Sequence, residues 1–307
     1  MLPLSTSGGR AEPSTTTLTL IMGQRTTLLK EAILYAWRKK WLTQFGRTAL
    51  HTPVIGPALR RVQQRLLPPG RRVWVRLDSG LGAGFWLQVD PYREQEYLRG
   101  TAEHDVQEAL AAQLKPDGCF FDVGAHVGLY SLIASRLVGP KGKVVAFEPD
   151  PSNAQLIREH AARNGLSNIS VAQAAVWRSE GEVRFRRGGD QPTGKSSRRG
   201  AVVDSEVAKG SGEIISVQAV PLDRFAAGNC SPEVIKIDVE GAECEVLEGA
   251  AGLLARAKPT LICEVHTAEA AAFVEEFLPA RDYCVQWVPL RYAFPFPRHF
   301  VAVSRQR

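Results

Sequence analysis

The stretch Phe120-Phe-Asp-Val-Gly-Ala-His-Val-Gly128 decides the fold of this 307-residue chain. In it, an apolar run ends in an acidic residue, two glycines follow four positions apart, and a helical pattern continues to residue 138. Small residues in such a turn let the backbone approach a ligand, and the start of the helix offers unpaired N–H groups and partial positive charge. The stretch therefore predicts a strand, a ligand-binding turn and a helix.

The rest of the chain alternates strand and helix patterns around this stretch. The expected strands are residues 119–123, 143–148, 169–172, 234–238 and 260–265, and the expected helices are residues 127–138, 151–164, 242–256 and 268–278. Residues 283–288 and 298–303 are expected to close the sheet as a strand pair, and residues 184–199 to form a mobile loop. This order predicts an α/β fold with a doubly wound, mostly parallel sheet.

Residues near the predicted turn indicate which nucleotide ligand is expected, because the ligand of a doubly wound sheet lies at the carboxyl ends of its strands. The dinucleotide pattern G-x-G-x-x-G is not met at this turn, where His126 and Leu129 occupy its second and third positions. Glu148 ends the second expected strand, and a carboxylate there accepts two hydrogen bonds from a ribose diol. With Asp122 favouring a cationic end, the expected ligand is S-adenosylmethionine.

Three ordered segments carry a resemblance to a known family. They are Asp122-Val-Gly-Ala-His-Val-Gly128, Val145-Ala-Phe-Glu-Pro-Asp-Pro151 and Ile235-Lys-Ile-Asp-Val-Glu-Gly-Ala-Glu243. Together they resemble the FkbM-type methyltransferases over about residues 100–264. The resemblance implies a class I Rossmann-like fold and S-adenosylmethionine-dependent methyl transfer, commonly to oxygen on sugars or secondary metabolites. The cofactor-binding residues that it implies are Glu103, Asp122, Gly124, Ala125, His126, Gly128, Glu148, Pro149, Ala175 and Asp238.

Two positions depart from the family's usual pattern. Asn usually follows Gly-Ala in the first segment, whereas this chain has His126, whose imidazole is bulkier and titrates near neutrality. After the third expected strand, members often have a short polar turn, whereas this chain has Ala174-Ala-Val-Trp-Arg178. The adenine contacts at that point are left open.

Methyl transfer to an alcohol requires a base for the hydroxyl proton, so polar residues at the strand ends are candidates. Asp238 ends the fourth expected strand and Glu240 follows it, while Glu264 and His266 end the fifth with alternate spacing. We predict His266 or Asp238 as the base, with Glu264 orienting the imidazole or the acceptor hydroxyl. Glu240 either joins this group or complements the dipole of the next helix, and Lys236 is expected to pair with an acid. These carboxylates and the imidazole also suit a divalent cation, but their spacing does not demand one, and no metal is predicted.

Basic residues concentrate at the N-terminus, where 13 of the 38 Lys and Arg residues precede Leu77, with two of the 32 acidic residues. Residues 1–27 lack periodicity and are expected to be disordered. Residues 28–70 are expected to form a basic amphipathic helical extension, and residues 71–307 a methyltransferase domain with its core at 100–290. The pattern of residues 28–45 suits contact with an anionic membrane, or packing on the domain that follows.

Composition limits the compartment and the partners. No apolar run approaches the ~18 residues of a membrane span, and no secretory signal is evident. The five cysteines lie far apart, without a C-x-x-C pair, and are expected to be reduced, buried residues. We therefore expect a cytoplasmic protein, with the inner membrane face as a peripheral location. The expected partner is a small-molecule or glycan acceptor.

Two other functions stay open at this point. The basic N-terminus and residues 184–199 suggest a nucleic-acid methyltransferase, but no N-P-P-Y-like segment or aromatic stacking platform supports nucleic acid as partner. The second is a cofactor-binding module without turnover, which the basic helix recruits to a membrane or a partner. Asp238, Glu264 and His266 argue against that module. The sequence does not indicate an oligomeric state.

Overall fold

The computed structural model describes residues 56–68, 70–92, 94–100, 102–187, 201–202, 213–289 and 296–305. The chain divides into two units, Met1–Arg71 and Arg72–Arg307. In the first unit, the described residues form helix α3 (Gly56–Leu66). The expectations for residues 1–27 and 28–45 fall outside the described residues. Within the described ranges, no helix is long and apolar enough to cross a bilayer.

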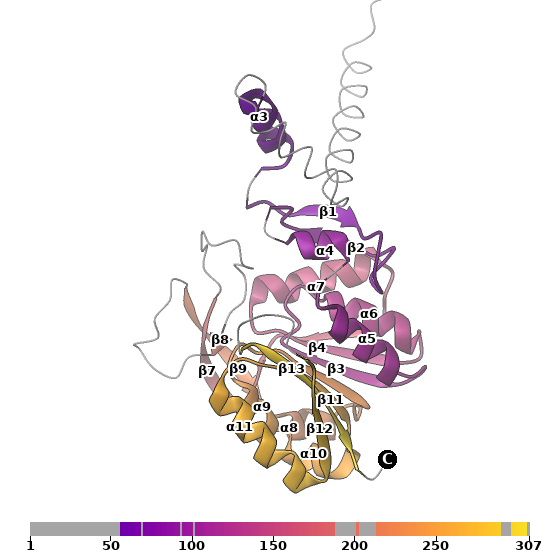
Figure 1. Ribbon diagram of the computed structural model, residues 1–307, viewed down its shortest axis with the longest axis vertical. Coiled ribbons are helices and arrows are strands. Elements are labelled where there is room, and N and C mark those ends of the chain that lie inside the picture. The colour runs from indigo at the N-terminus through magenta and orange to yellow at the C-terminus, as the bar shows by residue number, and fades with distance from the viewer. Residues whose placement is uncertain are drawn as a thin grey trace, which may run out of the picture. The chain divides into compact units, whose positions relative to one another are not determined.

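A seven-stranded sheet is the centre of the second unit, in the order β12-β13-β11-β10-β3-β4-β5 (Figure 1). Its strands are β3 (Cys119–Val123), β4 (Lys143–Phe147), β5 (Ile169–Ala172), β10 (Val234–Ile237), β11 (Thr260–Val265), β12 (Tyr283–Trp287) and β13 (Arg298–Ser304). The strands from β5 to β11 run parallel, whereas β13 and β12 each pair antiparallel with their neighbour. The predicted α/β fold with a mostly parallel sheet is confirmed.

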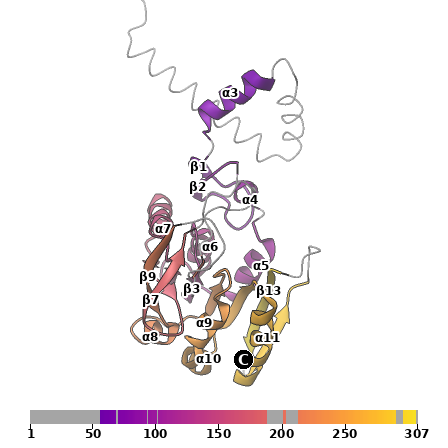
Figure 2. The same ribbon diagram turned by 90° about the vertical axis from the view of Figure 1, so that its left-hand side faces the viewer.

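Helices cover both faces of the sheet (Figures 1 and 2). One face carries α5 (His104–Gln113), α6 (Leu129–Val138) and α7 (Pro151–Arg163), and the other carries α8 (Leu222–Ala227), α9 (Glu243–Glu248), α10 (Ala251–Ala257) and α11 (Ala268–Phe277). The predicted helix 242–256 is thus two helices, separated where Gly249 lies against the carbonyl group of Trp177. Helix α7 begins after Asp150, whose side chain accepts hydrogen bonds from the N–H groups of Ser152 and Asn153.

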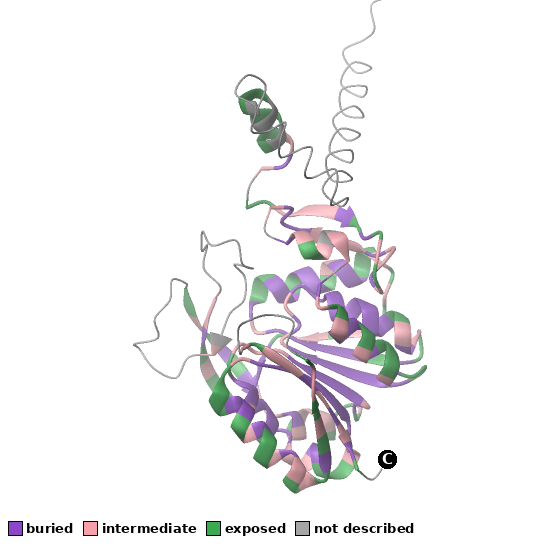
Figure 3. Cartoon of the chain, viewed as in Figure 1, coloured by how far each residue is buried: buried purple, intermediate pink, exposed green. Residues whose placement is uncertain are grey.

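The hydrophobic core lies between the sheet and these helices. Every residue of β3 and of β11 is buried (Figure 3). Strands covered on both faces are expected to be apolar throughout, which explains why Phe120, Phe121 and Val123 follow one another without polar alternation. The charged residues on these strands are Asp122 and Glu264, two buried acids near the carboxyl ends.

A second sheet, of four strands in the order β6-β9-β7-β8, was not anticipated. Its strands are β6 (Ala175–Val176), β7 (Gly181–Arg186), β8 (Ala201–Val202) and β9 (Ile214–Val220). The expected mobile loop 184–199 is therefore wrong for residues 184–186, which pair with β9, and residues 188–199 lie outside the described ranges. The remaining elements are β1 (Val73–Arg76), β2 (Trp86–Val89), α4 (Gln95–Arg99) and the short 3-10 helix η1 (Pro279–Arg281).

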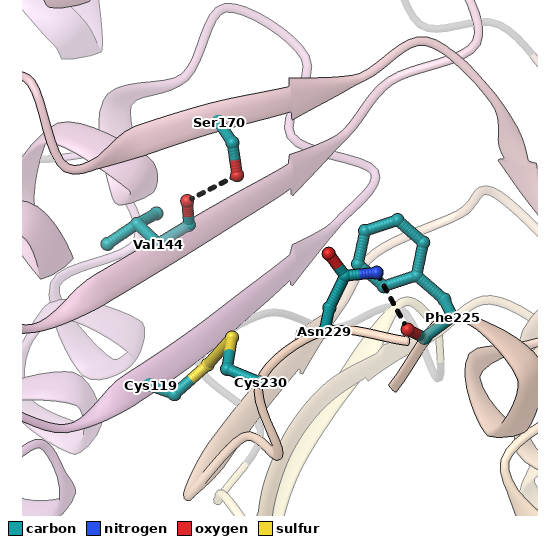
Figure 4. The surroundings of a disulfide bond; sticks show 6 residues. All are labelled: Cys119, Val144, Ser170, Phe225, Asn229 and Cys230. Carbon is teal, nitrogen blue, oxygen red and sulfur yellow. Dashed lines mark hydrogen bonds between the residues drawn. A yellow bond between two sulfur atoms is a disulfide. The ribbon is translucent and has the colours of Figure 1, made fainter. Parts of the chain in front are cut away.

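Cys119 and Cys230 form a disulfide bond, which corrects the expectation of five reduced cysteines (Figure 4). They are 111 residues apart, with Cα atoms separated by 6.6 Å. Cys119 begins β3, and Glu233, just before β10, donates its backbone N–H to the carbonyl of Cys119 at 2.8 Å. The parallel pairing of β3 with β10 thus brings the two cysteines together, which no local sequence pattern indicates.

Thiol titration of the unfolded chain tests this bond. Without reductant we expect three reactive thiols, from Cys244, Cys263 and Cys284, and after reduction all five. Reduction is expected to lower the free energy of unfolding by about 2–5 kcal/mol, because the bond closes a long loop in the unfolded chain. Five thiols in the protein purified without reductant would contradict the bond.

Candidate active site

A cavity lies at the carboxyl ends of β3, β4 and β10. The predicted site residues that line it are Glu103, Gly124, Ala125, His126, Glu148, Pro149, Ala175, Asp238 and Glu240. Strand β6 and the second sheet supply further wall residues, including Val176, Phe185 and Val202. Four predicted residues, Asp122, Gly128, Glu264 and His266, are not among the lining residues. The structure therefore brings most of the cofactor-binding set to one cavity.

The turn after β3 is held by close backbone contacts. Gly124 and Ala125 both donate their N–H groups to the carbonyl of Phe147, at 3.1 and 3.0 Å. Gly124 has φ +77°, and a Cβ atom there would overlap the carbonyl oxygen of Asp238. Gly128 has φ +80° and lies against the side chain of Ile157. Both glycines are thus required by backbone conformation and by close packing.

Glu148 is buried at the start of the turn that follows β4. Its Oε2 accepts the N–H of His126 at 2.8 Å, and its Oε1 accepts the N–H of Asp150 at 2.9 Å. Each carboxylate oxygen has a second lone pair, so the side chain retains the capacity to accept two ribose hydroxyls. Burial raises the pKa of Glu148 to about 8, against the opposing effect of these hydrogen bonds.

Asp122 does not face the cavity, which corrects its predicted contact with the cationic end of the ligand. It is fully buried, its Oδ2 accepts the hydroxyl of Ser131 at 2.6 Å, and its Oδ1 lies 3.7 Å from Nζ of Lys236. Alternation along β3 sends Phe121 and Val123 into the core on one face and Asp122 towards α6 on the other. The carboxylates that do line the cavity at this end are Glu103 and Asp238.

Lys236 connects the buried Asp122 to the cavity. Its ammonium lies 3.6 Å from Oδ2 of Asp238, as well as 3.7 Å from Asp122, and 5.1 Å from the ring centre of Tyr130. Burial lowers the pKa of Lys236, but the charges of Asp238 and Asp122 outweigh burial and raise it overall. The expected pairing of Lys236 with an acid is found, and it involves two acids.

His266 lies just beyond β11 among three carboxylates. Its Nδ1 is 2.8 Å from Oε1 of Glu243, and its Nε2 is 3.4 Å from Glu240 and 3.8 Å from Asp238. Burial lowers the pKa of His266, but the hydrogen bond to Glu243 and the charges of Glu240 and Asp238 raise it to about 9. Glu243 is fully buried and was not predicted as a site residue, although it stands in the third family segment.

Glu264 occupies a different place from the one predicted. It pairs across the sheet with His299 of β13, and its Oε2 lies 3.8 Å from Nε2 of that residue. The carboxylate that holds the imidazole of His266 is Glu243 instead. Ligand-type atoms converge within 4.8 Å in the group Asp238, Glu240 and His266, and again in the group Glu103, Glu264 and His299.

A phosphate-loop sequence pattern occurs in the chain, away from the turn after β3. Gly189-Asp-Gln-Pro-Thr-Gly-Lys-Ser196 matches G-x-x-x-x-G-K-[ST] and lies outside the described residues. The flanking strands β7 and β8 pair antiparallel. A phosphate loop requires a strand that leads into a helix, so we assign no phosphate site to this segment.

The parallel sheet, the glycine turn after its first strand and the acid after its second define a class I Rossmann-like methyltransferase. The model of the methyltransferase FkbM domain matches residues 122–285, and the chain belongs to this family. Its cofactor is S-adenosylmethionine. The residues present suit it, because Glu148 would accept hydrogen bonds from the ribose hydroxyls, and the carboxylates of Glu103 and Asp238 line the same cavity, where they would face the positively charged end.

Relatives of known name are methyltransferases. Hexuronic acid methyltransferase AglP of Haloferax volcanii is 29% identical over 191 residues, which are 61% of this chain and 72% of AglP. A ribosomal protein L11 methyltransferase of Clostridium perfringens is 24% identical over 156 residues, 50% of this chain but 43% of that protein. A structure of methyltransferase FkbM from Methylobacillus flagellatus is 17% identical in sequence, with a TM-score of 0.41. The matched region covers 70% of this chain and 55% of that chain.

Gly124→Ala tests the close approach of the turn to β10. We expect a loss of about 2–4 kcal/mol in the free energy of unfolding, because the new methyl group overlaps the Asp238 carbonyl and the backbone has positive φ. Gly165→Ala is the matched control, since Gly165 has φ +67° but no atom within 4 Å of the added Cβ. Urea unfolding should show the smaller loss, about 1 kcal/mol, in the control. Equal losses would contradict the packing argument.

The pKa of Glu148 predicts a pH-dependent affinity for S-adenosylmethionine. Below about pH 8 the buried carboxyl holds a proton that must leave before both ribose hydroxyls can donate to it. Affinity should therefore rise with pH up to about 8, by at most about tenfold per pH unit, and then level off. Titration calorimetry at a series of pH values measures this affinity. Glu148→Gln is the control, because ionisation of the ligand itself affects both proteins while the variant has no carboxyl group at position 148. Identical pH profiles for both proteins would exclude the carboxylate contact.

Proposed function

We propose that this protein transfers the methyl group of S-adenosylmethionine to a hydroxyl oxygen of a sugar, glycan or related small molecule. The observation that carries the proposal is Asp238, a carboxylate that lines the cofactor cavity and is held by the buried ammonium of Lys236. A hydroxyl acceptor must lose a proton, so a positioned carboxylate of this kind is the expected base. The hexuronic acid methyltransferase among the relatives supports a sugar as acceptor class.

The residues of the chain divide the work of this reaction. The turn from Gly124 to Gly128 admits the adenosine, and Glu148 accepts the ribose hydroxyls. When bound, S-adenosylmethionine would supply a methyl group on a positively charged sulfur, for in-line transfer to the acceptor oxygen with the carbon–sulfur electron pair left on sulfur. Asp238 takes the hydroxyl proton, and Lys236 stabilises its ionised form before transfer. Most of the rate enhancement is expected from alignment, for which about 7–11 kcal/mol is available.

Labelled methyl transfer to a panel of D-glucuronic acid, D-galacturonic acid and D-glucose tests the proposal. We expect a methyl ether, which survives mild alkali, whereas a methyl ester on a uronic carboxyl group would be hydrolysed. Asp238→Asn should lower kcat by about 10²–10⁴-fold, because it removes the base while keeping the side-chain shape. S-adenosylhomocysteine affinity should stay within a few-fold.

The control for that variant is Glu269→Gln, which changes an exposed acid in the first turn of α11 and should leave kcat unchanged. Full activity of Asp238→Asn would rule out its role as base. An alkali-labile product would show that the acceptor is a carboxylate, for which no base is needed.

A further inference from the structure

The imidazole of His266 is held at one nitrogen, and its other nitrogen faces two acids. Oε1 of Glu243 lies 2.8 Å from Nδ1 and also accepts the N–H of Gly241 at 2.9 Å, so this carboxylate is itself fixed. Nε2 is buried and has no hydrogen-bond partner among the described residues. Its separations from Glu240 and Asp238, 3.4 and 3.8 Å, exceed the ~2.7–2.9 Å of a charge-assisted hydrogen bond.

These groups suit a small molecule that accepts one hydrogen bond and donates another. A hydroxyl oxygen beside Nε2 and Asp238 would accept a hydrogen bond from Nε2–H and direct its own proton to Asp238. His266 does not line the cofactor cavity itself, but Asp238 and Glu240, which its Nε2 faces, both line it. The acceptor oxygen of the proposed reaction must lie at this edge, since Asp238 is its base.

The charges around His266 decide whether Nε2 donates or accepts. Glu243 from α9 and Asp238 and Glu240 from the segment after β10 all act on the ring. From the neighbouring strands come Lys236, 3.6 Å from Asp238, and the pair of Glu264 with His299 at 3.8 Å. Three carboxylates against one ammonium favour an imidazolium ring, which is a donor at both nitrogens.

We propose that Glu243 is a positioning residue that presents the Nε2–H of His266 to the oxygen of the acceptor hydroxyl, while Asp238 removes the hydroxyl proton. The inference rests on the proposed function and assigns the two candidate bases different roles. In the step, the O–H proton moves to Asp238, the oxygen lone pair forms the bond to the methyl carbon, and the carbon–sulfur pair passes to sulfur. His266 keeps its proton throughout.

Carbon-13 NMR of histidine-labelled protein tests the donor state without any acceptor. The signal that is lost in His266→Asn identifies the residue. We expect its titration midpoint near pH 9 in the parent protein. Glu243→Gln keeps an acceptor for Nδ1–H and removes the charge, so the midpoint should fall by about 1–2 pH units. Glu245→Gln, on the same helix, should leave it unchanged. A parent midpoint at or below about 6.5 would overturn the inference.

The pH dependence of kcat with the sugar that the panel identifies separates a donor from a base. If His266 donates, activity falls as pH rises through its pKa, and Glu243→Gln moves this alkaline fall to lower pH. If His266 were the base, the variant would instead move the acid limb to lower pH. That result would overturn the inference and leave methyl transfer intact. Absence of transfer to every sugar would overturn the proposed function, while the NMR midpoint still tests His266.

A divalent cation is the rival ligand of the same three side chains. Asp238, Glu240 and His266 offer ligand atoms within 4.8 Å of one another. We expect activity to survive treatment with EDTA, and micromolar Mn²⁺ to leave the His266 signal sharp. Loss of activity in EDTA with recovery in Mn²⁺, together with selective broadening of that signal, would identify Asp238, Glu240 and His266 as metal ligands. That result would overturn the donor role.

Discussion

The carbonyl oxygen of Asp238 occupies the space where a side chain on residue 124 would lie, and this contact sets the geometry of the site. It brings the carboxyl ends of β3 and β10 together at backbone distance, so the cofactor turn and the proposed base belong to one rigid unit. The N–H of Asp238 also donates to the carbonyl of Val123 at 3.0 Å. In the proposed reaction this contact would hold adenosine binding and proton removal in a fixed relation, which in-line transfer requires.

Behind this contact lies a buried set of charges that stability alone does not explain. Asp122 and Lys236 are nearly inaccessible, and removing such charges from water costs several kcal/mol for each ion even when they are paired. Apolar side chains would fill the space at lower cost. We attribute the presence of these charges to the proposed function, in which Lys236, itself paired with Asp122, holds Asp238 at the cavity wall.

Three of the six described non-glycine residues with positive φ lie in the same region. Glu103, His126 and Glu240 have φ values of 40°, 53° and 54°, in the left-handed region that side chains other than glycine seldom adopt. All three line the cavity. Such conformations persist where the surrounding contacts over-determine them, as the hydrogen bond from His126 N–H to Glu148 does here. The departure from Asn at position 126 is thus accommodated by a backbone contact that the side chain does not make.

Local patterns were enough to predict the alternating strands and helices, the glycine turn and Glu148, because each depends on residues close together in the chain. The turn, Glu148 and Asp122 together indicated S-adenosylmethionine, and the family resemblance implied the same cofactor. Tertiary packing decided the rest. The side chain of Asp122 lies on the α6 side of β3, because Phe121 and Val123 enter the core on the other face. Strands β7 and β9 pair although a long stretch of chain connects them. Cys119 is bonded to Cys230, and Glu243 rather than Glu264 contacts the imidazole of His266. Both contacts arise because neighbouring strands of a parallel sheet bring together segments that are distant in sequence. The spacing of residues along the chain does not predict such contacts, since they depend on strand order and on the face of the sheet from which each side chain projects.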